Sequence, residues 1–400
     1  MIAPKLRFSE FKDEWFKQKI GDFIINHVGG ASFTPNDFVK ESNFEVIPKK
    51  AIMSGGKLIL DKENPTFSSE DFYQNNLKNT IDKSYLVTTL RDLVPSGPSI
   101  GYIVSFDDDK KYILAQGVYG FRIKDDLNRN FLIQFSNTSK FRTIMQSKMV
   151  GSTQVHIRNQ DYFDTEIYKP CLEEQTKIAE FLSAVDDKIS QLSRQLELLN
   201  QYKKGVMQKI FSQEIRFKND NGEDFGEWEE VQIKDIFKVT RGQVLPVSQV
   251  CSEKDDDYKF PVYSSQTKND GLMGYYTEYL FENAVTWTTD GANAGTVKFR
   301  MGKFYCTNVC GVLLSDQGYA NKCIAEILNS TAFKYVSYVG NPKLMNNVMS
   351  EIPLYIPSSI QEQEKIAGFL TAIDERIDHT TAQLTHTKQW KKGLLQQMFV

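Results

Sequence analysis

Hydrophobic residues recur in alternating steps of four and three along two stretches of the chain, residues 174–211 and 362–399. This heptad pattern predicts two amphipathic helices that each carry a coiled-coil seam. At about 1.5 Å per residue, each helix is expected to be on the order of 50 Å long. The residues predicted to pair the helices are Ile178, Leu182, Val185, Ile189, Leu192, Leu196 and Leu199 in the first stretch, and Ile366, Leu370, Ile373, Ile377 and Leu384 in the second.

The two stretches are near-copies that align without a gap, residue 174 against residue 362. The triplet Lys203-Lys204-Gly205 recurs in the second copy as Lys391-Lys392-Gly393. Such self-similarity indicates a tandem duplication, in which a globular unit and a helix each occur twice. Weaker similarity extends outside the helices, where Leu6–Phe8 returns as Ile215–Phe217 and Glu14-Trp15 returns as Glu227-Trp228.

Neither predicted helix can leave such an apolar stripe exposed to water. The simplest partner for each helix is the other copy, because two similar halves pair naturally about a pseudo-twofold axis. An axis perpendicular to the helices makes them antiparallel, and the pair then acts as a rigid spacer between the globular units. The segment Leu6–Trp15 is expected to pack near the end of the second helix. The alternative is a helical hairpin that serves only as a stabilising core.

Residues 20–165 and 230–357 contain short β-rich runs separated by Gly, Pro, Asn and Asp, which predicts mixed α/β domains with loop-rich surfaces. The expected fold class is α+β, with two α/β domains joined by two long antiparallel coiled-coil helices in a pseudo-twofold tandem repeat. The predicted division of the chain is 1–170, 171–212, 213–358 and 359–400. Inside the domains, the predicted alignment sets Thr88-Thr89, Gly101, Val118 and Gly120 against Thr288-Thr289, Gly295, Val309 and Gly311.

Composition narrows the function classes. No apolar run approaches the roughly 18 residues that a bilayer-spanning helix needs, and the N-terminus lacks the apolar core of a signal peptide. We therefore expect a cytoplasmic protein with no membrane partner, in which five scattered cysteines form no disulfide framework. The formal net charge is −3, so any affinity for DNA must come from local clusters of Lys and Arg.

Two such clusters are present. Residues 129–160 contain five basic residues and no acidic one, and Lys298, Arg300 and Lys303 form a second group. Basic side chains neutralise phosphates, and Arg, Lys, Asn and Gln reach base edges in the major groove. The alternative is that these are ordinary solvated faces. The candidate DNA-binding residues are Thr89, Arg91, Ser96, Ser99, Lys140, Arg142, Lys148, Gln154, His156 and Arg158 in the first domain, and Thr288, Thr289, Asn293, Lys298, Arg300, Lys303, Asn308 and Lys343 in the second.

Two pairs of loops occupy matching places in the repeat. Residues 94–99 correspond to residues 288–293, and residues 151–154 correspond to residues 340–343. Small residues in these loops let the backbone approach a phosphate closely. The same loops could equally be tight turns that bind no ligand.

The sequence carries no recognisable catalytic or metal-binding motif. It contains neither an Asn-Pro-Pro-aromatic motif for base methylation nor a phosphate-binding loop of the Gly-x4-Gly-Lys-Ser/Thr form. Cys306 and Cys310 have no second pair of ligands at metal spacing, and the four histidines are dispersed. We therefore predict that this chain is not an enzyme and holds no cofactor or metal of its own.

The repeated helix starts point to a known family. The pattern Glu-Gln-x-Lys-Ile-Ala-x-Phe-Leu at residues 174–182, followed by Asp186 and Ile189, recurs at residues 362–370, followed by Asp374 and Ile377. It resembles the conserved helical regions of type I restriction–modification specificity subunits. The resemblance is highly specific in the two helices and only suggestive in the globular units.

The resemblance implies that each globular unit is a target recognition domain that reads one half of a split, asymmetric site in double-stranded DNA. It implies that the antiparallel helices set the spacing between the halves, and that two methyltransferase subunits and motor-nuclease restriction subunits join the chain. S-adenosylmethionine, ATP and magnesium would then belong to those partners.

Two other functions remain open at this stage. One is a scaffold that binds no DNA and carries two protein-binding modules on a coiled-coil strut, for which the interruptions at Thr380 and Thr387 could form a docking surface. The other is a self-contained nuclease or methyltransferase, which the missing motifs disfavour.

Overall fold

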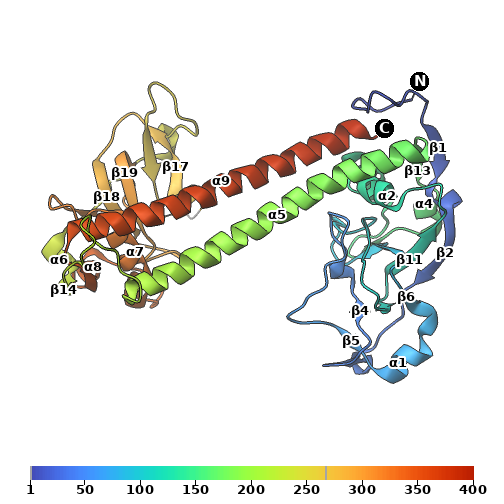
Figure 1. Cartoon of the computed structure of the whole chain (residues 1–400), viewed down its shortest axis with the longest axis horizontal. Helices are drawn as coiled ribbons and strands as arrows, with labels where there is room; N and C mark the ends of the chain where they lie inside the picture. Colours follow the sequence, from blue (N-terminus) through green and yellow to red (C-terminus); the bar gives the residue numbers. More distant parts are fainter. Residues whose placement is uncertain (1, 266–267) are drawn as a thin grey trace. The chain divides into compact units, whose positions relative to one another are not determined.

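The computed structural model describes residues 2–265 and 268–400. Contacts divide the chain into two units: unit 1 comprises Met1–Arg194 with Thr381–Val400, and unit 2 comprises Gln195–Thr380. Two long helices, α5 (Leu172–Phe211) and α9 (Ile360–Met398), each contribute residues to both units (Figure 1). Each compact unit therefore consists of a globular part and a section of both helices.

Unit 1 is built on an antiparallel four-stranded sheet in the order β2-β11-β7-β9. Its strands are β2 (Ile24–Gly29), β11 (Val118–Ile123), β7 (Leu86–Thr89) and β9 (Ile103–Val104). The smaller sheets pair β1 (Phe16–Lys19) with β13 (Glu166–Lys169), β4 (Val46–Ile47) and β6 (Thr80–Ile81) with β10 (Tyr112–Leu114), β3 (Phe38–Val39) with β5 (Phe67–Ser68), and β8 (Arg91–Asp92) with β12 (Val155–His156).

The short helices of unit 1 begin at residues that cap their first turn. Asn128 and Thr138 accept hydrogen bonds from the backbone N–H three residues ahead, as N-cap side chains do. The α-helices are α1 (Glu70–Asn75), α2 (Arg129–Ser136), α3 (Ser139–Lys148) and α4 (Asn159–Phe163), and the 3-10 helices are η1 (Ile20–Phe23), η2 (Pro35–Asp37), η3 (Lys49–Ala51) and η4 (Leu77–Asn79).

Unit 2 is built on a six-stranded sheet in the order β15-β20-β18-β19-β16-β17, in which only the β16–β19 pair is parallel among the described strands. The strands are β15 (Lys238–Arg241), β20 (Cys310–Leu314), β18 (Phe281–Thr288), β19 (Val297–Cys306), β16 (Phe260–Tyr263) and β17 (Leu272–Tyr276), and β14 (Trp228–Gln232) pairs separately with β21 (Pro353–Pro357). The helices are α6 (Ile233–Ile236), α7 (Lys322–Thr331), α8 (Asn346–Ser350), η5 (Val247–Gln249), η6 (Lys268–Gly271) and η7 (Ala332–Tyr335).

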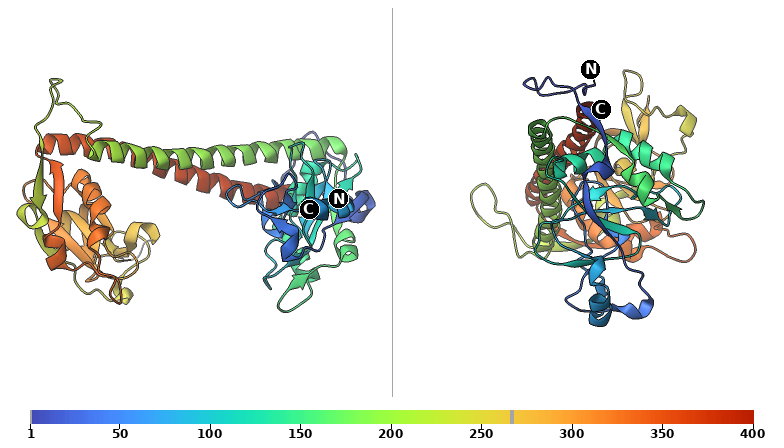
Figure 2. Two further views of the ribbon diagram at one scale, coloured as in Figure 1. Left: turned by 90° about the horizontal axis from the view of Figure 1, so that it is seen from below. Right: turned by 90° about the vertical axis from the view of Figure 1, so that its right-hand side faces the viewer.

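The long helices are antiparallel within each unit, as the sequence predicts (Figures 1 and 2). In unit 1, Lys391 near the end of α9 donates to Asp186 near the start of α5 at 2.5 Å. In unit 2, Lys203 near the end of α5 lies 2.9 Å from Asp374 near the start of α9. The repeat relates these two ion pairs to each other, because Asp186 matches Asp374 and Lys203 matches Lys391. The pseudo-twofold fold class is therefore confirmed.

The predicted stripe faces the interior. Ile178, Leu182 and Val185 belong to the core cluster of unit 1, and Ile366, Leu370 and Ile373 belong to that of unit 2. Each cluster also contains the side chains of its globular part, so the beginning of each helix packs on its own domain as well as on the other helix. Among the other predicted pairing residues, Leu192 and Leu384 are buried, and Ile189, Leu196, Leu199 and Ile377 are half-buried.

Each long helix begins with a buried Glu-Gln pair that ties it to its globular part. Glu174 accepts hydrogen bonds from Arg7, and Glu362 accepts them from Arg216. Gln175 and Gln363 donate to the carbonyl oxygens of residues 170 and 357, respectively. The Leu6–Trp15 segment packs where expected: the Leu6 N–H donates to the Gln397 carbonyl at 2.9 Å, and the Trp15 ring lies 6.5 Å from that of Phe399.

The alignment predicted inside the domains is wrong by one residue. The Thr89 carbonyl accepts from the Gly101 N–H, and the Thr288 carbonyl accepts from the Gly295 N–H, both at 2.9 Å. Thr89 therefore matches Thr288 and not Thr289. The neighbouring strand is also displaced by one residue from the predicted alignment. The carbonyl oxygens of Val118 and Cys310 accept equivalent hydrogen bonds from the N–H groups of Gly30 and Gly242, so Val118 matches Cys310 and not Val309. The cause is the period of a strand: a shift of one residue exchanges its two faces, and a short Thr-Thr match does not fix the register.

Candidate nucleic-acid interface

In unit 1, two segments that are distant in the sequence meet at the end of β7. The Thr89 hydroxyl donates to the Gly117 carbonyl at 2.9 Å, which holds the turn before β11 against the strand end. The Ile157 N–H donates to the Leu90 carbonyl at 2.9 Å, which brings in the segment that follows α3. Because Thr89 is fully buried, it positions the junction and presents no polar group at the surface.

A hairpin stands on this junction, and we call residues 150–156 hairpin 1. Its base is closed by backbone hydrogen bonds between Val150 and His156, at 2.9 and 3.0 Å. The base also pairs with β8, with His156 opposite Arg91. Gly151 has a φ of +114°, and a Cβ there would lie 2.0 Å from the Gln154 carbonyl oxygen, so the turn requires glycine. Arg91, Gln154 and Arg158 are exposed around it, and His156 is half-buried.

Unit 2 repeats this arrangement. Backbone hydrogen bonds of 2.8 and 2.9 Å between Ser337 and Lys343 close residues 337–343, which we call hairpin 2. The Leu344 N–H donates to the Thr289 carbonyl at 2.9 Å, as Ile157 does to Leu90 in unit 1. Asp290 forms an antiparallel β-bridge with Lys343, and this pair corresponds to Arg91 and His156 in unit 1. In unit 2 these contacts join the two predicted loops, residues 288–293 and 340–343. In unit 1 hairpin 1 pairs instead with Arg91 and Asp92, so the predicted match of residues 94–99 with residues 288–293 is wrong.

The other loop at each junction is internally ordered. In unit 1, the Ser99 hydroxyl donates to the Asp92 carboxylate at 2.6 Å, while Ser96 is exposed. Burial acts to raise the pKa of Asp92, but hydrogen bonds from Ser99 and nearby backbone N–H groups lower it overall. In unit 2, the Thr289 hydroxyl donates to the Val309 carbonyl at 3.0 Å. Thr288 is buried and Asn293 is half-buried.

Two candidates of the first basic cluster are engaged inside the fold. Arg142 donates to the carbonyl oxygens of Ile100 and Pro98 at 2.5 and 3.2 Å, and its guanidinium lies 3.9 Å from the Tyr102 ring centroid. Lys148 donates to the Asp161 carbonyl at 2.5 Å and to the Thr165 hydroxyl at 2.8 Å. Burial lowers the pKa of both groups. Both side chains are therefore committed to contacts inside unit 1.

The second basic cluster is divided by strand geometry. Lys298 and Arg300 both point to the inner face of β19, because side chains two apart share a face. Arg300 is 8% exposed, stacks 3.8 Å from the Tyr263 ring centroid and donates to the Asp270 carboxylate at 3.0 Å. Lys298 pairs with the same carboxylate. Burial lowers the pKa of Lys298 and of Arg300. Because both side chains already pair with Asp270 inside unit 2, neither is available to a DNA phosphate.

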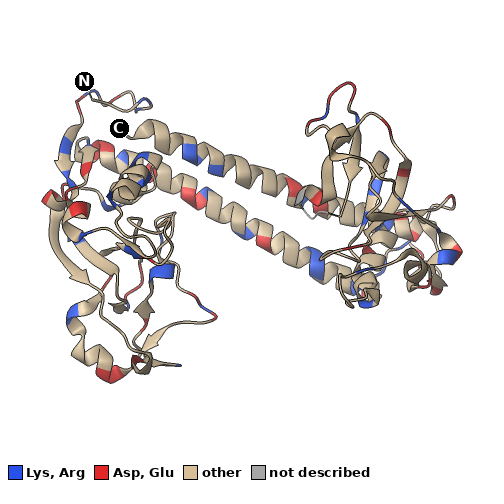
Figure 3. Cartoon of the chain, turned by 180° about the vertical axis from the view of Figure 1, so that it is seen from behind, with Lys and Arg blue, Asp and Glu red and all other residues tan. Residues whose placement is uncertain are grey.

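The remaining candidates lie at the surface. Lys140 is exposed, 5.6 Å from the Tyr168 ring centroid, and Lys303 is exposed, 4.5 Å from that of Tyr279. Asn308 and Lys343 are also exposed, and Lys343 lies 3.9 Å from Asp290. Basic and acidic residues are interspersed over both units (Figure 3). The exposed basic residues at the two junctions therefore lie in units that carry acidic residues as well.

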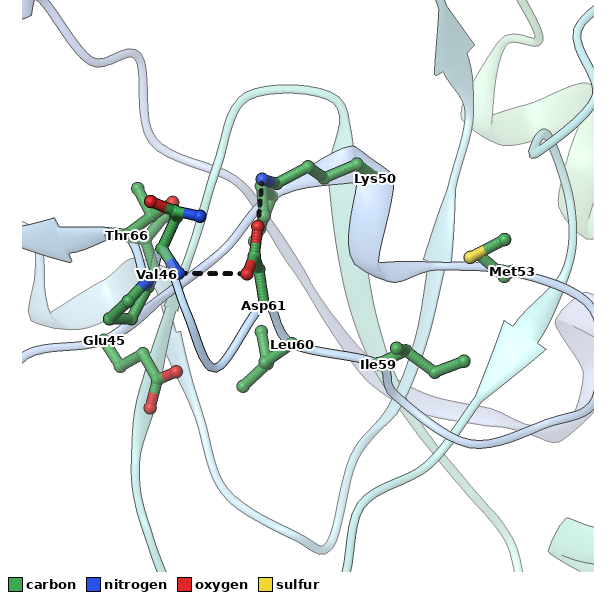
Figure 4. Close-up of a pocket in the computed structure, with 11 residues that line it drawn as sticks. Glu45, Val46, Lys50, Met53, Ile59, Leu60, Asp61 and Thr66 are labelled. Atoms are coloured by element: carbon green, nitrogen blue, oxygen red, sulfur yellow. Dashed lines mark hydrogen bonds and ion pairs between the residues drawn. The ribbon is translucent and has the colours of Figure 1, made fainter. Parts of the chain in front are cut away.

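Unit 1 also contains two cavities, of which the larger includes Asp92 of the junction in its lining. One, of about 560 Å³, is lined by Lys49, Met53, Leu93, Val94 and Tyr102, among others. The other, of about 260 Å³, contains Asp61, which accepts from Lys50 at 3.3 Å and from the Asn64 N–H at 3.0 Å (Figure 4). Lys50 and Asp61 of the smaller cavity are thus already paired with each other, and Glu45 pairs with Lys110 outside it. The site that both units share is the junction and its hairpin.

The residues that join the helices to each other and to the domains are not among the residues predicted from the sequence. These are the ion pairs of Asp186 and Asp374 with the lysines of the repeated triplet, and the buried Glu-Gln pairs. A signal was present, since all of them are polar positions that both copies share. Among the described residues no helix is both long and apolar enough to cross a membrane. No cluster of three or more metal-ligating side chains occurs among them either.

Comparison with known proteins agrees with this architecture. The chain matches the model of the type I restriction modification DNA specificity domain twice, over residues 12–201 and 226–387. It is 43% identical over 143 residues to the N-terminus of a putative type I specificity subunit of Mycoplasma pneumoniae; the alignment covers 35% of this chain and 74% of that protein. It is 36% identical over 151 residues to the MpnII specificity subunit of the same organism, covering 37% of this chain and 44% of that subunit.

A solved structure shares the fold. The crystal structure of a type I restriction–modification S subunit from M. genitalium superposes with a TM-score of 0.68 and 17% identity, covering 100% of this chain and 99% of that one. At this level of identity the likeness concerns the fold alone. The two matches to the family model cover most of the chain, one in each half of the tandem repeat. The chain therefore belongs to the type I restriction–modification DNA specificity family, whose members are the non-catalytic DNA-recognition subunits of restriction–modification complexes.

Proposed function

We propose that this chain recognises a bipartite, asymmetric sequence in double-stranded DNA, with one half read by each unit. The observation that carries the proposal is the repeated junction: each unit fixes a hairpin on the end of its central strand, through the Ile157–Leu90 and Leu344–Thr289 hydrogen bonds. The hairpins share a backbone scaffold but differ in sequence. Two hairpins with the same backbone arrangement and different side chains at their tips suit the recognition of two different half-sites.

The proposed contacts divide into two kinds. Arg91, Arg158 and Lys140 in unit 1, and Lys343 and Lys303 in unit 2, are exposed cations that can neutralise phosphates. Gln154 and Asn308 are exposed amides, a side-chain type that forms paired hydrogen bonds with adenine in the major groove. Phosphate contacts fix the position of the protein on the duplex, and base contacts select the sequence.

We further propose that the paired helices set the gap between half-sites. Half-sites on one face of the duplex lie about 34–36 Å apart for each helical turn. The two helices are 40 and 39 residues long and are cross-linked by ion pairs in both units, which favours a stiff element. The proposal includes two methyltransferase subunits and motor-nuclease subunits as partners. S-adenosylmethionine, ATP and magnesium would then bind to those partners, which methylate adenine or cleave the DNA.

Methylation mapping tests the proposal. The chain is expressed with a methyltransferase partner in a host that lacks other adenine methylation, and the genome is read by long-read sequencing. The expected result is one motif with two defined halves and an undefined gap of constant length. A single continuous motif, or methylation that is the same without this chain, would refute the proposal.

A further inference from the structure

Hairpin 2 presents apolar side chains at its tip. Tyr338 is 69% exposed and Val339 is 92% exposed. Gly340 follows with a φ of +77°, and a Cβ built there would meet no atom within 4 Å. The tip therefore stands clear of the rest of unit 2, and its two large side chains contribute little to the core.

The base of hairpin 2 is firmly held. Leu344 is fully buried, and Val336 is 7% exposed. The Gly291 N–H donates to the Pro342 carbonyl at 2.9 Å, which ties the tip to the strand-end loop. A tip on such a base keeps its orientation, so the entropy lost when a ligand binds is small.

Hairpin 1 has the same scaffold and a different tip. Five residues separate its closing pair, Val150 and His156, and five residues separate Ser337 from Lys343. Residues 151–154 are Gly, Ser, Thr and Gln, all exposed, whereas the apolar Val155 is buried. Unit 1 thus presents a polar tip where unit 2 presents an apolar one.

The charge of the residues around both hairpin tips favours a polyanion as their binding partner. Residues 331–350, which contain hairpin 2, include two lysines and no acidic residue. Lys334 and Lys343 are exposed on either side of the tip. Residues 129–160, which contain hairpin 1, likewise lack acidic residues. One acidic group, Asp290, lies beside hairpin 2, 3.9 Å from the Lys343 ammonium group.

We propose that the tip of hairpin 2 enters a groove of the DNA duplex and that Tyr338 and Val339 determine the sequence of one half-site through apolar base contacts. The thymine methyl group is the apolar feature of the major groove, and such contacts distinguish thymine from cytosine. Hairpin 1 reads the other half-site through Gln154, by hydrogen bonds to adenine. This inference rests on the proposed function and adds to it which residues determine specificity.

The test uses the full chain with its methyltransferase partner and compares three variants with the wild type. The first is the double substitution Tyr338→Ala/Val339→Ala, the second is Gln154→Ala, and the third is Met301→Ala. Met301 is 84% exposed on β19 of the same unit, outside hairpin 2, and serves as the matched control. Thermal unfolding of each purified chain checks that the fold is kept, which is expected because all these side chains are exposed.

The double variant should relax discrimination at one or two positions of one half-site by on the order of tenfold, as loss of a base contact does. Gln154→Ala should relax the opposite half by a similar factor, and Met301→Ala should leave both halves unchanged. The inference fails if the double variant keeps the wild-type motif, if both halves weaken equally, or if the variant loses its methyltransferase while its isolated DNA binding is unchanged. In all three cases wild-type bipartite methylation still stands, so failure of the inference is distinct from failure of the proposed function.

Discussion

Two buried glutamates show how single residues anchor the long helices. Arg7 donates to both carboxylate oxygens of Glu174, at 2.8 and 2.7 Å, in the bidentate geometry that makes such bonds strong. Trp15 adds an indole N–H at 3.4 Å. Glu174 is also in the first turn of α5, where a negative charge is favoured by the helix dipole. Glu362 has the equivalent partners Arg216 and Trp228.

Glu174→Ala should destabilise the protein by about 3 kcal/mol, the lower end of the cost of breaking a buried ion pair, because the Arg7 guanidinium would lose its partner. Urea unfolding at neutral pH measures the change. Glu173→Ala is the control, since Glu173 is its exposed neighbour on the same helix and should change stability by less than about 0.5 kcal/mol. Equal effects of the two substitutions would contradict the anchoring role of Glu174.

Arg158 and Arg142 should separate DNA binding from stability. Arg158→Ala removes an exposed cation at hairpin 1, so DNA binding should weaken and the slope of log affinity against log salt should become shallower by about 0.9 per lost phosphate contact. Arg142→Ala removes internal hydrogen bonds to Ile100 and Pro98, so it should lower stability instead. Gel shifts across a salt series, together with urea unfolding of both variants, measure the two effects. An unchanged slope for Arg158→Ala would remove this residue from the phosphate contacts.

At the scale of elements, polar residues in the heptad stripes act as cross-links. Lys203 lies 2.9 Å from Asp374 and 3.1 Å from Glu326 of α7. Lys322, also of α7, lies 2.5 Å from the same Asp374. Lys203 occupies the heptad position between Leu199 and Val206, where the apolar stripe of α5 is interrupted. An ion network at this position therefore joins both long helices to a domain helix. A charged residue in a seam also specifies register, because any shift along the helix would leave it unpaired.

This network predicts a pH dependence. Partial burial acts to raise the pKa of Asp374, but hydrogen bonds from Lys322 and Lys203 outweigh it and lower the pKa overall. A carboxyl with a lowered folded-state pKa stabilises the protein above its unfolded pKa of about 3.9, and this stability is lost as the pH falls through the folded value. The stability difference between wild type and Asp374→Asn should therefore shrink below about pH 4.

Urea unfolding at pH 7 and at several points below pH 4 measures that difference. Asp378→Asn is the control, because Asp378 is exposed one turn away on the same helix. The control should follow the wild type at every pH. A constant offset for Asp374→Asn across the whole range would show that ionisation of this carboxyl does not stabilise the fold.

How far the sequence predicts these elements depends on the range of the interactions involved. The long helices, their pairing and their direction follow from the heptad stripe and the repeat, since both are visible in residue types and their spacing along the chain. The internal register was wrong by one residue because Thr-Thr and Gly recur too often to fix it. The internal roles of Arg142 and Arg300 were missed because the sequence does not show which neighbour a basic side chain meets. The junctions were missed because they depend on hydrogen bonds such as Ile157 to Leu90, which join distant segments.

At the scale of the whole molecule, duplication explains why one chain can serve an asymmetric target. The helix starts, the ion pairs and the junctions are repeated, and they keep the two halves structurally alike. The hairpin tips differ, so each half can select its own sequence without changing the frame. Under the proposed function, the paired helices set the distance between the half-sites, and the hairpin tips determine the base sequence of each half-site. These two properties should therefore be separable by mutation.

Insertion of one heptad into each helix tests that separation. The insertions are placed after Arg194 in α5 and after Thr380 in α9, where the chain passes from one contact unit to the other. Adding seven residues to both helices keeps the antiparallel stripes in phase and lengthens the pair by about 10 Å, which is about three base pairs of duplex DNA. An insertion in α5 alone would put the stripes out of register, so it serves as the control and should lower stability. Methylation mapping of the doubly extended chain should show both half-site sequences unchanged and a longer gap between them. A changed base sequence in the half-sites, with an unchanged gap between them, would contradict the proposal that the helices set the gap.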